Sequence, residues 1–178
     1  DLRMPAILDG QGQSLHMDAT QAARSGRYDA VYLDPPYNQH KYLGNYHIWE
    51  SLVRWDKPDV FGVACKRVDC KEYKSAYNSV KAAHTAFEEL LSSLQARYLV
   101  VSFSNEGFIQ REKMEEMLGN FGVVDTLEVD YKRYVGAQIG IHNPKGQKTG
   151  KVSHLRNKEY LYVVAEDRAA LSRLQIAC

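Results

Sequence analysis

The segment that most constrains the fold is residues 28–33 (YDAVYL), followed at once by Asp34-Pro35-Pro36-Tyr37. A short apolar run rich in β-branched and aromatic residues predicts a buried strand. The two prolines must end it, because proline fixes its own φ and has no N–H to donate to a neighbouring strand. The chain therefore delivers a carboxylate, a free carbonyl and an aromatic ring to the carboxyl end of a strand, where open α/β sheets bind ligands.

These groups suit one kind of ligand. Asp34 precedes a proline and is held in extended geometry, so its carboxylate should project from the strand end. The carbonyl of Pro35 is a second acceptor beside it. Tyr37 can stack on a planar heterocycle, a contact worth about 1–3 kcal/mol per base. Together they predict a site for a planar base that carries an exocyclic amine.

The motif and its surroundings resemble a known family, the D12 class of adenine-specific DNA methyltransferases that use S-adenosylmethionine. The resemblance includes Asn38 and three further segments: 45–50 (NYHIWE), 101–105 (VSFSN) and 157–164 (NKEYLYVV). It spans roughly residues 14–165. It implies a Rossmann-like methyltransferase fold and methyl transfer to the 6-amino group of adenine in double-stranded DNA, as in restriction-modification systems.

The resemblance also implies a role for each residue of the motif. Asp34 and the Pro35 carbonyl would accept the two N–H bonds of the amine and stabilise its developing positive charge, Pro36 would be a rigid spacer, and Tyr37 would clamp the base. Preorganised groups of this kind are worth about 3–4 kcal/mol each. The target base must be flipped out of the duplex. The alternative is a proline-terminated strand without chemistry.

Asp18 is a candidate for cofactor binding. Residues 14–19 (SLHMDA) predict a brief strand that ends in this acid, and a helix over residues 19–24 would lead back to the strand before Asp34. Asp18 would then share a sheet edge with Asp34, and the resemblance implies that both line the cofactor site. Asp18 is equally suited to cap the helix, and the two roles are compatible.

Later segments alternate between helix and strand. Three-four spacing of apolar residues predicts a helix over 75–96, followed by a buried strand over 97–105, a helix over 110–118 and a strand over 122–134. The alternation predicts an α/β fold with a mainly parallel sheet. Ser104 and Asn105 end one strand, where they either shape the base pocket, as the resemblance implies, or form an ordinary turn.

A basic segment, residues 131–158, contains lysines and arginines but no Asp or Glu, although the net charge of the chain is only +1. Asn143-Pro144-Lys145-Gly146 at its middle predicts a hairpin or loop between two strands. We expect this segment to contact DNA phosphates, through Lys145, Lys148, Lys151 and Arg156. A solvated surface loop is the alternative.

Residues 39–74 predict a long loop with one short helix near 48–54. Lys41, Tyr42 and Tyr46 follow the motif closely, and we expect them to guide DNA or cap the base. The apolar side chains after them predict a satellite core beneath the loop: Trp49, Leu52, Val53 and Trp55.

Composition predicts one cytoplasmic domain over residues 1–178. The sequence has no apolar run long enough to span a membrane and no visible signal peptide. The three cysteines lack the paired spacing of zinc sites, and the histidines show no ligand pattern, so we expect no metal.

The sequence departs from the family in one respect. No glycine-rich turn for the methionine part of the cofactor precedes Asp34; residues 9–12 (DGQG) are the nearest candidate and lead into a strand-like segment. We therefore expect the C-terminal part of a longer enzyme, with a sheet incomplete at its N-terminus. Residues 28–33 would then form an exposed edge able to associate with another strand.

Two other functions remain open at this level. Some methyltransferases that act on guanine in ribosomal RNA resemble the same motif, and the basic segment argues moderately against them. The second alternative is that the chain is truncated and inactive but still binds nucleic acid through residues 131–158.

Overall fold

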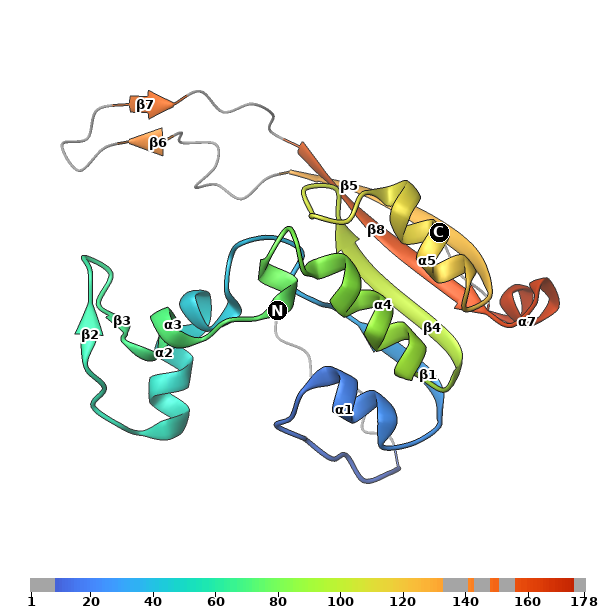
Figure 1. Ribbon diagram of the computed structural model, residues 1–178, viewed down its shortest axis with the longest axis horizontal. Helices are drawn as coiled ribbons and strands as arrows, with labels where there is room; N and C mark the ends of the chain where they lie inside the picture. The colour runs from blue at the N-terminus through green and yellow to red at the C-terminus, as the bar shows by residue number, and fades with distance from the viewer. Residues whose placement is uncertain (1–8, 133–140, 143–147, 151–155, 175–178) are drawn as a thin grey trace.

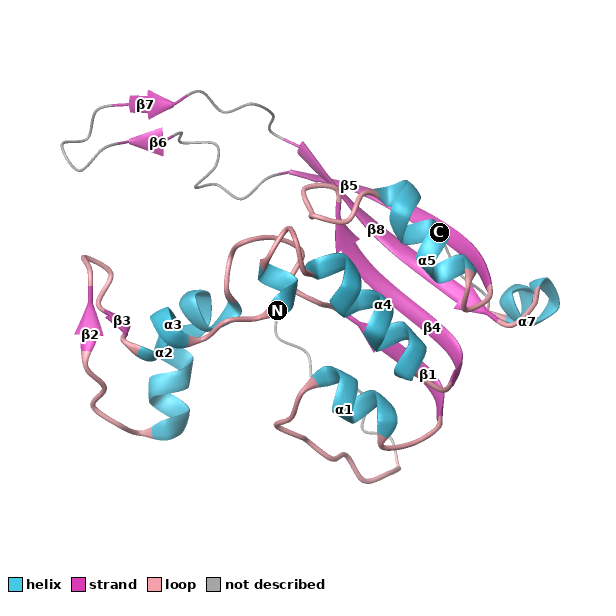
Figure 2. Ribbon diagram, in the orientation of Figure 1, coloured by secondary structure: helices cyan, strands magenta, loops and turns pink. Residues whose placement is uncertain are grey.

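A four-stranded sheet forms the centre of the computed structural model, which describes residues 9–132, 141–142, 148–150 and 156–174 (Figures 1 and 2). The strand order is β1-β4-β8-β5. The strands span Tyr28–Leu33 (β1), Ala96–Ser104 (β4), Arg156–Ala165 (β8) and Val123–Lys132 (β5). The sequence predicted the ends of all four strands to within about two residues.

The expected mainly parallel sheet is confirmed in part: β1, β4 and β5 run in one direction, and β8 is the strand of this described sheet that runs against them. β1 runs parallel to β4, but β8 is antiparallel to both of its neighbours, β4 and β5. The reason is the connection between β5 and β8, which returns the chain along the strand it has just left, and such a return reverses direction. The connection includes the short antiparallel strands β6 (Ile141–His142) and β7 (Lys148–Gly150). The chain therefore has an α/β fold with a mixed sheet.

Two helices cover one face of the sheet, α4 (Ala83–Ser93) and α5 (Arg111–Gly119) (Figure 1). Their buried side chains pack on alternate residues of β4, namely Leu99, Val101 and Phe103. The other face packs at one end against α7 (Arg168–Arg173), through Leu171. Strand alternation therefore divides the core into two clusters.

One predicted helix boundary and one predicted strand are corrected. The helix expected from residue 75 begins at Ala83, after the 3₁₀ turn η1 (Ala76–Asn78), and Val80 is 65% exposed. The helix α1 (Ala19–Arg24) is as predicted, but residues 14–18 form no strand. Their side chains are exposed and no described strand lies beside them to pair with.

Residues 41–74 form a small lobe beside the sheet, which we call the α2 lobe (Figure 1). It contains α2 (Tyr42–Arg54), β2 (Val60–Phe61), β3 (Lys66–Arg67) and α3 (Asp69–Glu72). The helix is longer than the sequence predicted, with a kink at Tyr46. The predicted satellite core is wrong, because Trp49, Leu52, Val53 and Trp55 are all exposed, Trp49 at 65% and Trp55 at 85%.

Arg67 organises the α2 lobe instead of an apolar core. Its side chain is 3% exposed and donates to both carboxylate oxygens of Asp56, at 2.6 and 2.9 Å, and to Asp69 at 3.0 Å. It also donates to the hydroxyl of Ser51 at 3.1 Å. Arg67 thereby joins α2 to the hairpin and to α3, and lowers the pKa of both carboxyl groups through its hydrogen bonds.

β1 is an edge of the described sheet, as predicted, because only β4 pairs with it there. Its side chains are mostly exposed, Tyr32 at 60%. In the part of the chain that the structure describes, no helix has the length and apolar character needed to cross a bilayer.

Candidate active site

The Asp-Pro-Pro-Tyr motif lies where the parallel strands β1 and β4 end. Leu33, the last residue of β1, is in register with Val101 of β4, so the motif follows at the carboxyl edge of the sheet. Asp34 is exposed, and none of the hydrogen bonds among the described residues uses its carboxylate. An exposed carboxylate that no described residue engages in this way is available to a ligand.

Three hydrogen bonds fix the main chain at the end of the motif and just after it. The N–H of Phe108 donates to the carbonyl of Tyr37 at 2.8 Å, and the Asn78 amide donates to the carbonyl of Asn38 at 2.7 Å. The same amide donates to the carbonyl of His40 at 3.2 Å. Segments far apart in sequence thus hold the motif, and Asn78 is a positioning residue that the sequence analysis did not single out.

A hollow of about 350 Å³ lies against the motif and contains both acids that the sequence predicted to meet. Asp18 and Asp34 line it together with Pro35 and Pro36. The rest of its wall includes four tyrosines, which are Tyr32, Tyr42, Tyr73 and Tyr77. Sequence reasoning missed Tyr73 and Tyr77, and their only signal was a tyrosine-rich stretch beside an aperiodic loop.

Asp18 caps α1, so this predicted role is confirmed. Its Oδ1 accepts from the N–H groups of Thr20 at 2.9 Å and Gln21 at 3.2 Å. Asp18 also lines a second hollow of about 720 Å³ that shares Tyr73 and Tyr77 with the first. The cap and a place on the pocket wall therefore coexist in one residue.

Burial moves the pKa of two pocket tyrosines further above the neutral range. Burial raises the pKa of Tyr42 to about 12, with further contributions from Asp34 and Tyr37. Burial likewise raises the pKa of Tyr77 to about 12, with Asp18 contributing. Tyr42 also packs edge-on against Tyr46, with ring centroids 6.3 Å apart. The hydroxyl of Tyr77 donates to the carbonyl of Ala86 at 3.3 Å.

The residues expected to bind DNA are not brought together among the described residues. Lys41 donates to the main-chain carbonyls of Cys70 at 3.1 Å and Lys71 at 3.4 Å, which fastens the start of α2 to α3. Arg156 is exposed at the start of β8. Lys148 lies in β7, while Lys145 and Lys151 fall outside the described residues.

Ser104 and Asn105 have structural contacts at the end of β4. Ser104 is 1% exposed, and its hydroxyl accepts from the N–H of Glu106 at 3.4 Å. Asn105 accepts from the N–H of Lys158 through its side chain at 3.0 Å. Both residues hold the turn after β4 beside β8.

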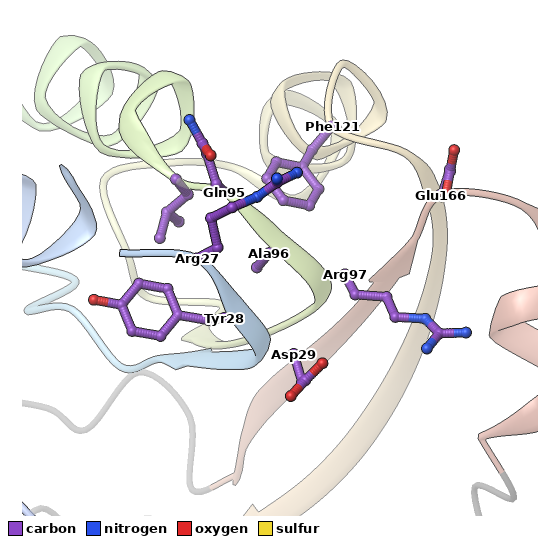
Figure 3. A pocket seen from close by; sticks show the side chains of 9 residues that line it. Arg27, Tyr28, Asp29, Gln95, Ala96, Arg97, Phe121 and Glu166 are labelled. Carbon is purple, nitrogen blue, oxygen red and sulfur yellow. The ribbon is translucent and has the colours of Figure 1, made fainter. Parts of the chain in front are cut away.

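Another hollow, of about 740 Å³, lies at the opposite end of the sheet (Figure 3). It is lined by Arg27, Asp29, Arg97 and Glu166, among others. Figure 3 shows Arg27 and Arg97 extending in different directions, so their charges do not converge on one ligand. Among the described residues no group of His, Cys, Asp or Glu is arranged to hold a metal ion. The motif is therefore the candidate site among the described residues.

A match to a known sequence family shows which family the chain belongs to. The sequence model of the D12 class N6 adenine-specific DNA methyltransferase matches residues 2–117. The chain belongs to this family. The matched region contains Asp18, the Asp-Pro-Pro-Tyr motif and Tyr77, and it ends before the basic segment.

Several curated proteins are similar to this D12-class chain. Modification methylase StsI of Streptococcus sanguinis is 32% identical over 132 residues, covering 72% of this chain and 20% of that protein. The type II methyltransferase M.FokI of Planomicrobium okeanokoites is 31% identical over 79% of this chain and 20% of its own length. The type II methyltransferase M.NlaIII of Neisseria lactamica is 29% identical over 83% of this chain and 43% of its own length.

The D12-class chain thus spans less than half the length of these relatives, and about a fifth of StsI and M.FokI. No solved structure matches it.

Proposed function

We propose that this chain carries the methyl-transfer centre of a site-specific DNA adenine methyltransferase of a restriction-modification system. The observation that carries the proposal is the meeting of Asp34, Pro35 and Asp18 in one aromatic-walled hollow at the carboxyl edge of the sheet. Membership of the D12 class and similarity to three modification methylases support it. The arrangement around this edge supports a Rossmann-like fold.

Asp34 and Pro35 would act on the adenine 6-amino group. The lone pair of that amine is delocalised into the ring, so the nitrogen gains positive charge as it becomes tetrahedral. Asp34 has an exposed carboxylate and the Pro35 carbonyl lies next to it in the chain. Two acceptors fixed at this point stabilise the charge without having to reorganise during the reaction.

Tyr37 would hold the base in the plane that the acceptors require. Its main chain is anchored by Phe108, and its ring is half-buried against the core. Pro36 restricts the backbone just before it. In duplex DNA the target base must leave the stack to reach this ring, and an aromatic surface recovers part of the stacking energy.

S-Adenosylmethionine supplies an electrophilic methyl group when it is bound. The residues of this chain that fit it are Asp18 and Asp34. Among the described residues the Oδ2 atom of Asp18 has no hydrogen-bond partner, and Asp18 lines both the hollow at Asp34 and the second hollow beside it. A carboxylate oxygen in this position suits an amino group of the cofactor.

DNA would be held outside the hollow. Lys41, Lys145, Lys148, Lys151 and Arg156 remain the candidates for phosphate contacts, on the basis of their charge. The edge strand β1 is a candidate for association with a further strand, because an unpaired apolar edge is seldom left open.

Transfer of a labelled methyl group tests the proposal. We expect the full-length protein to label duplex DNA and to leave ribosomal RNA unlabelled. Labelling of guanine in ribosomal RNA would favour the other methyltransferase class, although family membership speaks against it. Absence of transfer to either nucleic acid would refute the proposal.

A further inference from the structure

The turn after β4 is attached to the catalytic motif by a main-chain hydrogen bond. Within this turn the N–H of Gly107 donates to the carbonyl of Ser104 at 3.0 Å, and the N–H of Phe108 donates to Tyr37 at 2.8 Å. On its other side His84 of α4 approaches the carbonyl of Phe108 at 3.3 Å. The turn is therefore fixed to the motif and to a core helix.

The ring of Phe103 supports the ring of Tyr37 from the protein interior. The two rings meet edge-on, with centroids 6.2 Å apart and an interplanar angle of 72°. This is a favourable arrangement for an aromatic pair. Phe103 is 3% exposed within the main core cluster, so its ring cannot move without disturbing its neighbours.

Gly107 is the residue that leaves room for the Phe103 ring. A Cβ atom at position 107 would lie 2.2 Å from Cε1 of Phe103 and 2.9 Å from both Cδ1 and Cζ. These separations are far below van der Waals contact. Any larger residue at 107 must displace the Phe103 ring, and Tyr37 packs against that ring.

We infer that Gly107 and Phe103 are positioning residues for Tyr37, acting through the packing of one ring on the other. The inference rests on the proposed function for its catalytic consequence, but the packing itself is independent of that function. A displaced Tyr37 would hold the base out of line with the acceptors at Asp34 and Pro35. The effect should fall on the rate of the bound complex more than on DNA affinity.

Gly107→Ala in the full-length protein tests the inference, with two matched glycines as controls. At Gly122 a Cβ would lie 2.2 Å from the carbonyl oxygen of Ala165, an overlap as close as that at Gly107 but with backbone, at the opposite end of the sheet. At Gly119 a Cβ meets nothing within 4 Å. Gly122→Ala thus reports the cost of a comparable clash, and Gly119→Ala the cost of the substitution itself.

We expect kcat per folded molecule to fall at least about 10-fold in Gly107→Ala, since a displacement of 1 Å can cost about 100-fold, while KM for DNA changes by less than about twofold. Both control variants should keep wild-type kcat per folded molecule. A kcat of Gly107→Ala equal to that of wild type, or of Gly122→Ala, would overturn the inference.

Phe103→Leu keeps the inference testable if Gly107→Ala does not fold. It removes the supporting ring without adding a clash, and should lower kcat in the same way. Where both variants fold, kcat of the double variant should be close to that of Phe103→Leu alone, because leucine has no atom at the Cε1 position, where the new Cβ comes closest to the ring. Simple addition of the two effects would contradict the coupling.

An NMR measurement separates failure of this inference from failure of the proposed function. Cross-peaks between the Tyr37 and Phe103 rings should disappear or shift in Gly107→Ala and persist in Gly122→Ala, whether or not the protein transfers methyl groups. Unchanged cross-peaks would refute the packing argument. A wild-type protein without methyl transfer would refute the proposed function alone.

Discussion

At the scale of the residue, the site combines an exposed acid with a firmly held ring. Asp34 is exposed at the strand end, whereas Tyr37 has its carbonyl bonded to Phe108 and its ring packed against Phe103. In the proposed function, the acid accepts from a base whose orientation the ring fixes. Such fixed orientation is a source of rate enhancement in itself.

The stacking role of Tyr37 predicts different results for two substitutions. Tyr37→Ala should lower turnover by about 10-fold or more, because stacking on one base is worth about 1–3 kcal/mol. Tyr37→Phe should keep most of the activity, because the ring remains and the hydroxyl has no proposed role. Steady-state methylation kinetics measure both, and a Phe variant as slow as the Ala variant would reject the clamp.

At the scale of the element, the α2 lobe depends on ion pairs rather than on apolar packing. Arg67 is buried among Asp56 and Asp69, while the tryptophans of α2 face outward. Removal of one partner from a buried ionic cluster is strongly destabilising, since the remaining charges are left without compensation.

Arg67→Met should therefore lower the midpoint of thermal unfolding by at least about 6 °C. Arg54 is the matched control: it approaches Asp56 and Asp69 at 3.4 Å, but its side chain is 53% exposed. Arg54→Met should shift the midpoint by no more than about 2 °C. Circular dichroism measures both midpoints. Equal shifts in the two variants would show that Arg67 has no special role.

The same cluster predicts a pH dependence. Hydrogen bonds from Arg67 lower the pKa of Asp56 and Asp69 in the folded protein. Their stabilising contribution is complete above the unfolded pKa of about 3.9 and is lost as pH falls through the folded values. The stability difference between wild type and Arg67→Met should thus be constant near neutral pH and shrink below about pH 4. A difference that grows in acid would contradict this assignment.

The basic segment between β5 and β8 predicts salt-dependent DNA binding. Replacing Lys145, Lys148 and Lys151 by Gln should weaken binding to all sequences and reduce the log–log salt slope by about 0.9 for each phosphate that is no longer neutralised. Lys113→Gln is a control, because Lys113 lies on α5 and is paired with Glu116 at 2.9 Å. Salt titrations of DNA affinity measure the slope, and an unchanged slope would indicate a merely solvated segment.

Elements with a strong local pattern were predictable from the sequence. β1, β4, β5 and β8 are short apolar runs bounded by turn residues, and α4 has buried residues at helical spacing. The direction of β8 was not predictable from periodicity, which is the same for a parallel and an antiparallel strand. The predicted satellite core around Trp49 and Trp55 was wrong for a related reason: the apolar character of a side chain does not show which other residues will cover it.

The site was predictable where one segment holds its residues and not where distant segments contribute. Asp34 to Tyr37 are contiguous, and Asp18 is one helix away. Tyr77, Asn78 and Phe108 approach the motif only through the tertiary fold, and no spacing rule connects them to it.

At the scale of the whole molecule, the described sheet ends in an open edge. Within that sheet β1 pairs only with β4, and Tyr32 on it is 60% exposed. Natural proteins commonly protect such edges with charges or with a covering segment.

The open edge predicts that the 178-residue chain self-associates. Its sedimentation coefficient should rise with protein concentration, and Tyr32→Lys should reduce this rise by placing a charge on the edge. Val53→Lys is the control, since Val53 is 85% exposed on the α2 lobe. A monomer at all concentrations would show that β1 needs no partner, and association abolished only by Val53→Lys would place the contact on α2.

The identity of the methylated nucleoside is the most direct test of the account. DNA treated with the full-length protein and S-adenosylmethionine is digested, and its nucleosides are resolved by mass spectrometry. We expect N6-methyladenine with the wild-type protein and at least about 100-fold less with Asp34→Ala, whose DNA affinity should be nearly unchanged. N6-methyladenine formed at the wild-type rate by Asp34→Ala would contradict the central claim.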